Sequence, residues 1–150
     1  MTNPLPVYPC QSITSDFTID GKLSSPEWSG AEVIWLATVT TDEGRAEDIC
    51  GMTARDYFLS DGFEMETSNP QPTAFAALWS KSGLYLAFKC RDTNIIANLT
   101  EHDSPIYEEE VVEAFLCPTG DVSHYFELEV SPNNTTFDAT VFSPDKHRST

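Results

Sequence analysis

The sequence predicts an all-β protein whose strands form a two-sheet antiparallel β-sandwich. Three observations favour this class: apolar residues recur with a period of two, helical periodicity is scarce, and turn residues separate many short apolar segments. The 150 residues fit one domain, residues 1–150. Nine Phe, five Tyr and three Trp are available to fill its core.

The first expected strand covers residues 17–19. Ser25 is then followed by Pro26, a favourable pair for starting a helix, so we expect one short helical turn that places Trp28 beneath a sheet. A second strand is expected over residues 33–39. The tryptophans expected in the core are Trp28, Trp35 and Trp79.

Residues 42–72 are rich in acidic side chains and have no sustained period, so we expect a long surface loop or insertion, with a short helix or strand around residues 57–59. Thr73–Trp79 is apolar on both faces, which is typical of a central strand. The turn at residues 80–83 joins it to Leu84–Cys90 as a hairpin. The side chains expected to point inward from the second strand are Leu84, Leu86, Phe88 and Cys90.

Three more strands are expected over residues 111–116, His124–Val130 and Thr136–Phe142. The middle one alternates cleanly, so one face is expected in the core and the other in water. The core residues expected from the first two strands are Val112, Ala114, Leu116, Phe126, Leu128 and Val130.

Pairing of the first two of these strands as a hairpin would place carboxylates on the outer face. With Cys117 opposite Tyr125, Glu113 lies opposite Glu129 and Phe115 lies opposite Glu127. Like charges directly opposed on a sheet are destabilising, so this pair suggests a functional role for the two carboxylates. Aromatic rings stack on the apolar faces of sugars and carboxylates accept hydrogen bonds from hydroxyl groups, so this face is suited to a carbohydrate. The alternative is that Glu113 pairs with a cationic side chain or is simply solvated.

The charge balance excludes some partners. Eight basic and 24 acidic residues give a formal charge of −16, which disfavours binding to nucleic acid or to an anionic membrane surface. No stretch reaches the roughly 18–20 consecutive apolar residues of a membrane span. The first ten residues lack the basic start and apolar run of a signal peptide.

Cysteines and glycosylation motifs favour an extracellular or secreted location. Four cysteines without close spacing exclude a structural zinc site of the Cys-x-x-Cys type and leave either free thiols or three possible disulfide pairings. Asn98, Asn133 and Asn134 each begin an Asn-x-Ser/Thr acceptor motif. The cysteines are Cys10, Cys50, Cys90 and Cys117.

Four segments resemble, in order, the family 9 carbohydrate-binding modules: residues 17–31, 84–92, 107–116 and 125–133. The resemblance implies a β-sandwich, often with structural calcium, that is appended to secreted glycan-degrading enzymes such as xylanases. Such modules hold the reducing end of a sugar chain between two aromatic side chains.

The resemblance also assigns roles to individual residues. Tyr107 matches the first clamping aromatic, where the family's best-known members have Trp, and Glu113 matches the acid six residues later. The family's second aromatic comes roughly a hundred residues after the first, beyond Thr150, so the resemblance implies either a fragment or a shortened variant. The residues expected to bind sugar are Tyr107, Glu113, Tyr125, Glu127 and Glu129.

Calcium is expected from acidic charge and from the resemblance. Its candidate ligands are Asp16, Asp20 and Asp103, none of which belongs to an EF-hand loop. The histidines show no metal-binding spacing and are expected on the surface; they are His102, His124 and His147.

The expected function is non-catalytic binding of a polysaccharide or oligosaccharide, with a tethered catalytic domain in the parent protein. Opposed carboxylates on an open sheet face lack a cleft that would raise the pKa of one of them, so catalysis is not expected. A calcium-stabilised structural or adhesion domain without sugar affinity is the alternative. A haem-binding sandwich would need an axial pair such as Met52 or Met65 with His102.

Overall fold

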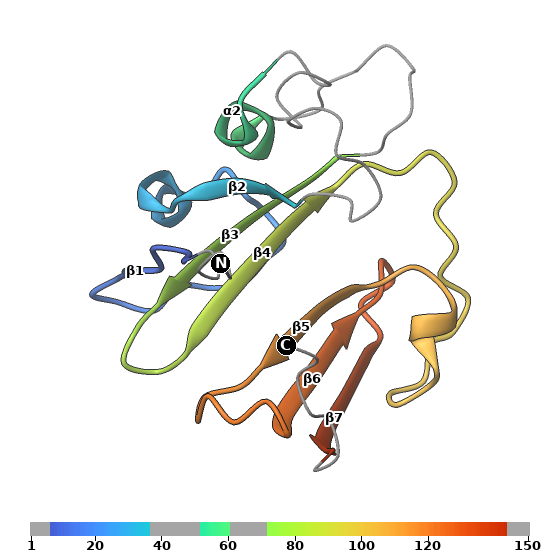
Figure 1. The fold of residues 1–150 in the computed structure, drawn as a ribbon. Helices are drawn as coiled ribbons and strands as arrows, with labels where there is room; N and C mark the ends of the chain where they lie inside the picture. Colours follow the sequence, from blue (N-terminus) through green and yellow to red (C-terminus); the bar gives the residue numbers. More distant parts are fainter. Residues whose placement is uncertain (1–6, 37–51, 61–71, 144–150) are drawn as a thin grey trace, which may run out of the picture. The chain divides into compact units, whose positions relative to one another are not determined.

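The computed structural model describes residues 7–36, 52–60 and 72–143. The chain divides into two compact units, Met1–Arg91 and Asp92–Thr150, each with its own sheet (Figure 1). Helix in the described residues is limited to one six-residue α-helix and two short 3-10 turns. The predicted all-β class with two mainly antiparallel sheets is therefore confirmed.

The sheet of the first unit is built around the predicted hairpin. Strand β3 (Thr73–Trp79) pairs antiparallel with β4 (Leu84–Cys90) and with β2 (Val33–Leu36). The short β1 (Gln11–Ser12), which the sequence analysis missed, runs parallel to β3. The hairpin turn closes with a 2.9 Å hydrogen bond from Ser80 N–H to the Gly83 carbonyl, so the predicted hairpin is confirmed.

Two short helical elements complete the core of this unit. The expected turn is η1 (Pro26–Gly30), and it buries Trp28 as predicted. Helix α2 (Ala54–Leu59) begins at Thr53, whose side chain accepts the Asp56 N–H, and it buries Phe58 completely. Six residues are too few for an isolated helix, so packing of Phe58 against Trp28 stabilises α2. This helix lies in the acidic stretch 42–72, most of which is outside the described residues.

Three expectations for the first unit are wrong. Residues 17–19 form no strand; instead Phe17 stacks on Tyr85, with ring centroids 4.7 Å apart. Tyr85 and Ala87 belong to the core, so this face of β4 is the inward one, and Leu84 and Cys90 are exposed rather than inward. Trp79 is exposed at the end of β3.

The sheet of the second unit has the order β5-β6-β7. Strands β5 (Val112–Leu116), β6 (His124–Val130) and β7 (Thr136–Phe142) are all antiparallel, and a 3-10 turn, η2 (Ile106–Glu108), contacts β6. The register places Glu113 opposite Glu129 and Phe115 opposite Glu127, as predicted. The alternation of apolar and polar residues along the two strands therefore specified this pairing correctly.

Burial of the two faces of this sheet differs from the prediction. Phe126, Leu128 and Val130, expected in the core, are 38–48% exposed, whereas Glu129 is 1% exposed. Among the described residues of this unit, η2 packs over the Glu129 end of β6. Both faces carry large apolar side chains, so alternation separates the faces without identifying which one is covered.

Hydrogen bonds hold the segment that leads to η2. The Asn133 side-chain amide donates to the Ala97 and Leu99 carbonyls, each at 2.9 Å. The Glu109 carboxylate accepts from the Asn98 and Leu99 backbone N–H groups at 2.6 and 3.2 Å. Partial burial raises the pKa of Glu109, but these hydrogen bonds, with one from the Asn98 side chain, lower it overall.

Candidate functional site

One face of the β5-β6-β7 sheet gathers four of the five residues predicted to bind sugar. On β6, Tyr125, Glu127 and Glu129 share a face because side chains two residues apart point the same way. The antiparallel partners Glu113 and Phe115 on β5 add to this face. We refer to this face, together with Tyr107 and Phe137, as the acidic-aromatic face.

Glu129 lies at the centre of the sheet and is buried. Its cross-strand partners are Glu113 on β5 and Phe137 on β7. Among the described residues no donor group faces its carboxyl oxygens, and only the Glu127 carboxyl is close enough to share a proton with them. Burial raises the pKa of Glu129, and the negative charges of Glu113 and Glu127 raise it further.

The burial of Glu129 conflicts with its predicted role as a sugar ligand. A charged carboxylate without a hydrogen bond is costly in a buried position, whereas a protonated carboxyl is much less so. Closed away from solvent, Glu129 cannot accept hydrogen bonds from sugar hydroxyls in this conformation. The expectation that it lies on a solvated surface is therefore wrong.

Tyr107 joins the acidic-aromatic face through Phe137. It sits in the middle of η2, where the preceding Ile106 is completely buried and anchors the turn. The Tyr107 and Phe137 rings meet edge to face, with centroids 5.7 Å apart. Tyr107 remains 54% exposed, so much of its ring is open to a ligand.

A second aromatic pair lies at the other end of the carboxylate row. The Phe115 and Tyr125 rings pack edge to face, with centroids 5.8 Å apart. Phe115 is 57% exposed and sits directly opposite Glu127. Its position was predicted from the strand register, but it was not assigned as a sugar contact; its outward orientation beside an acid was the available signal.

The candidate calcium ligands do not form one group. Asp16 accepts hydrogen bonds from the Ser80 hydroxyl and, at 2.8 Å, from the Tyr85 hydroxyl, which lower its pKa. Asp20 accepts from the Lys22 backbone N–H at 3.0 Å and pairs with its ammonium group at 3.5 Å. Each of these carboxylates is therefore satisfied locally.

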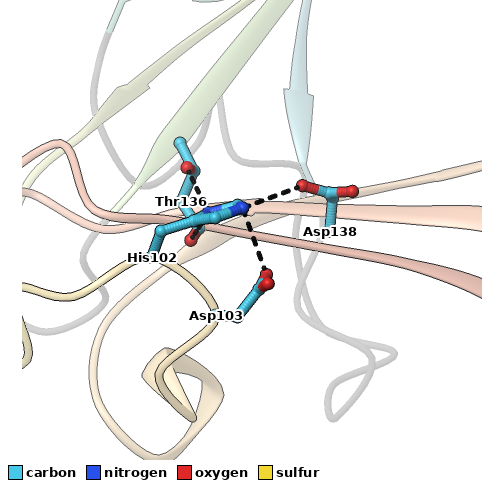
Figure 2. A network of polar contacts seen from close by, with 4 residues as sticks. All are labelled: His102, Asp103, Thr136 and Asp138. Atoms are coloured by element: carbon cyan, nitrogen blue, oxygen red, sulfur yellow. Dashed lines mark hydrogen bonds and ion pairs between the residues drawn. The ribbon is translucent and has the colours of Figure 1, made fainter.

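The third calcium candidate, Asp103, belongs to a different cluster. Its carboxylate and that of Asp138 both lie beside the His102 ring, and the His102 ring also contacts Thr136 (Figure 2). The sequence analysis expected His102 on the surface, where it is, but missed this grouping. No sequence spacing signals it, because His102 and Thr136 are 34 residues apart and meet only through tertiary structure.

Two further features of the described residues are free thiols and an open hollow in the first unit. Cys10 and Cys117 carry free thiols, and Cys50 lies outside the described residues. A wide, open hollow of about 590 Å³ in the first unit is lined by residues 21–24 and by the end of β4. None of the residues predicted to bind sugar lines it.

Comparison with known proteins gives one partial match. No family model and no solved structure matches the chain. A protein of Arthroderma benhamiae named "Extracellular protein" is 53% identical to it over 45 residues. The match covers 29% of this chain and 20% of that protein, so the chain spans about a fifth of its relative's length. Across the described residues, no helix has the length and apolarity that a membrane crossing requires.

Proposed function

We propose that this chain is a non-catalytic carbohydrate-binding module of a secreted protein and that it binds sugar on the acidic-aromatic face. The single observation that carries the proposal is the arrangement of exposed rings at both ends of a carboxylate row. Tyr107 lies beside Phe137 at one end, and Phe115 lies beside Tyr125 at the other. In the sheet register, Glu113 is level with Phe137, and Glu127 is directly opposite Phe115.

The chemistry of this face suits a chain of sugar rings. Exposed aromatic rings offer flat surfaces for the apolar faces of pyranoses, and carboxylates are strong acceptors for hydroxyl groups. Exposed Glu113 and half-buried Glu127 are the acceptors available to a ligand. Glu129 is buried beneath the binding surface and is not available to a ligand in this conformation.

The extracellular relative supports the proposed location, since its name places it outside the cell. We further propose that the ligand is a plant-type polysaccharide or its oligosaccharides and that the parent protein carries a catalytic domain that degrades it. The resemblance of residues 107–116 and 125–133 to family 9 modules supports this part of the proposal.

Isothermal titration of the whole chain tests the proposal. Glucose, xylobiose and cellobiose are titrated with calcium present and after chelation, and the alditol of each binding sugar serves as a matched ligand. We expect binding by at least one disaccharide, and weaker binding of its alditol if the reducing end is recognised. Absence of binding by a chain that circular dichroism shows to be folded would contradict the proposal and favour a structural domain.

A further inference from the structure

A histidine and two aspartates converge beside the edge strand β7. His102 Nε2 lies 3.5 Å from an Asp103 carboxylate oxygen and 3.6 Å from an Asp138 carboxylate oxygen. One ligand atom from each of the three residues lies within 4.8 Å of the other two. Figure 2 shows both carboxylates directed at the same nitrogen of the ring.

The other ring nitrogen fixes the orientation of the imidazole. His102 Nδ1 lies 2.9 Å from the Thr136 carbonyl oxygen, which can only accept a hydrogen bond, so we assign the proton to Nδ1. The Asp103 backbone N–H donates to the same carbonyl at 3.0 Å. These two bonds attach residues 102 and 103 to β7 and aim Nε2 at the carboxylates. Metal-binding histidines are commonly oriented by a carbonyl in this way.

With the proton on Nδ1, a neutral ring has a lone pair on Nε2. Three electron-rich atoms then face one another, which is unfavourable unless a positive charge lies among them. A second proton on the imidazole would supply one charge, and a bound cation would supply two. The formal charge of −16 on the whole chain also favours a bound cation.

The distances match a small transition-metal ion. Ligands about 2.1 Å from a tetrahedral zinc ion lie roughly 3.4 Å apart, close to the observed separations from Nε2. Zinc binds both histidine nitrogen and carboxylate oxygen, and where the protein supplies three ligands solvent can fill the fourth position. Calcium fits less well, because it takes six to eight oxygen ligands.

We propose that His102, Asp103 and Asp138 bind a divalent transition-metal ion, with Zn²⁺ as the best match. The site lies on the other side of the sheet from Glu129, since Asp138 pairs with Leu128 whereas Phe137 pairs with Glu129. It is therefore independent of the proposed sugar-binding face. The ion would cross-link residues 102 and 103 to β7 and stabilise the second unit.

Titration of the chain with Zn²⁺ tests this proposal. The protein is first stripped with a chelator, and its thiols are alkylated so that cysteines do not compete for the metal. We expect one Zn²⁺ per chain, an increase in Tm on binding, and at least tenfold weaker binding of Ca²⁺. No binding, or binding of Ca²⁺ as tightly as Zn²⁺, would overturn the proposal.

Substitutions locate the binding. His102→Ala and Asp138→Asn should each weaken Zn²⁺ binding at least tenfold. His124→Ala is the matched control, because this exposed histidine also lies near a carboxylate, with Nδ1 4.0 Å from Asp121; it should bind Zn²⁺ as the wild type does. Unchanged binding in His102→Ala, or equal loss in His124→Ala, would overturn the proposal. Circular dichroism without metal checks that each variant folds, and Asp103→Asn provides a further variant if one does not.

Discussion

Glu113 lies directly opposite Glu129 in the antiparallel register of β5 and β6, and Glu129 is almost completely buried. Two acidic side chains in this relationship repel each other if both are charged. Burial and the neighbouring negative charges raise the pKa of Glu129, which favours its protonated form and so reduces the repulsion. The pair therefore couples stability to pH.

The first prediction concerns this pH dependence. The pKa of Glu129 is higher in the folded chain than its ordinary value of 4.5, so the folded state holds more protons than the unfolded state above about pH 4.5. The contribution of Glu129 to stability is full below that pH and is lost as pH rises through the folded pKa. Glu129→Gln should raise Tm near pH 7 and flatten its dependence on pH.

Thermal unfolding of both proteins between pH 4 and 8 measures this effect. Glu101→Gln, a change at an exposed position, is the control and should leave the pH dependence close to that of the wild type. A lower Tm of Glu129→Gln near pH 7 would show that the carboxyl is charged and compensated in the fold.

The second prediction concerns the aromatic platforms. Tyr107→Ala and Phe115→Ala should each weaken sugar binding about tenfold or more, equivalent to about 1.4 kcal/mol, because each removes a stacking surface. Phe142→Ala is the matched control. It removes a similarly exposed ring from β7, on the face opposite Phe137, and should leave affinity unchanged.

Titration calorimetry measures the sugar affinity of these variants, and Tm measures their stability. Tyr107→Ala should change Tm by only a few degrees, because the ring packs edge to face on Phe137 and is more than half exposed. A large loss of Tm with affinity retained would instead assign Tyr107 to the packing of η2.

The third prediction concerns the attachment of the segment before η2. Asn133→Ala removes two hydrogen bonds that the amide donates to the Ala97 and Leu99 carbonyls and three that its Oδ1 accepts from Ser131 and Thr135. It should lower the free energy of unfolding by about 1–3 kcal/mol. Urea denaturation measures the change. Asn134→Gly is the control, because Asn134 has a φ of 67°, which glycine adopts readily, and its effect should be small. Equal destabilisation by both changes would show that the turn, rather than the amide bridge, matters.

The fourth prediction concerns helix α2. Phe58→Ala removes a completely buried ring and should destabilise the first unit by about 3–5 kcal/mol. Because α2 has only six residues, it should also lose its helical conformation. Tryptophan fluorescence during urea denaturation reports the change, since Trp28 contacts Phe58. A loss no larger than that of Phe142→Ala would contradict the assignment of Phe58 to the core.

Local sequence patterns were sufficient to predict much of the fold. Alternation and turn residues predicted the hairpin of β3 and β4, the bounds of β6 and β7, and the register that opposes Glu113 to Glu129. These features depend on neighbouring residues and on short connections, so the sequence specifies them directly. The short β1 escaped prediction because its two residues have no period of their own.

Burial and long-range grouping required tertiary structure. The alternation of His124–Val130 separates Glu129 from Leu128, but only the packing of η2 and Tyr107 on Phe137 identifies the covered face. The grouping of His102 with Asp138 depends on the attachment of one loop to the edge of β7. The sequence by itself thus determined the strands and their pairing, whereas the tertiary structure decided which carboxylates are buried and which lie beside a histidine. The physical reason is that pairing follows from local periodicity, while burial and charge clusters depend on contacts between distant segments.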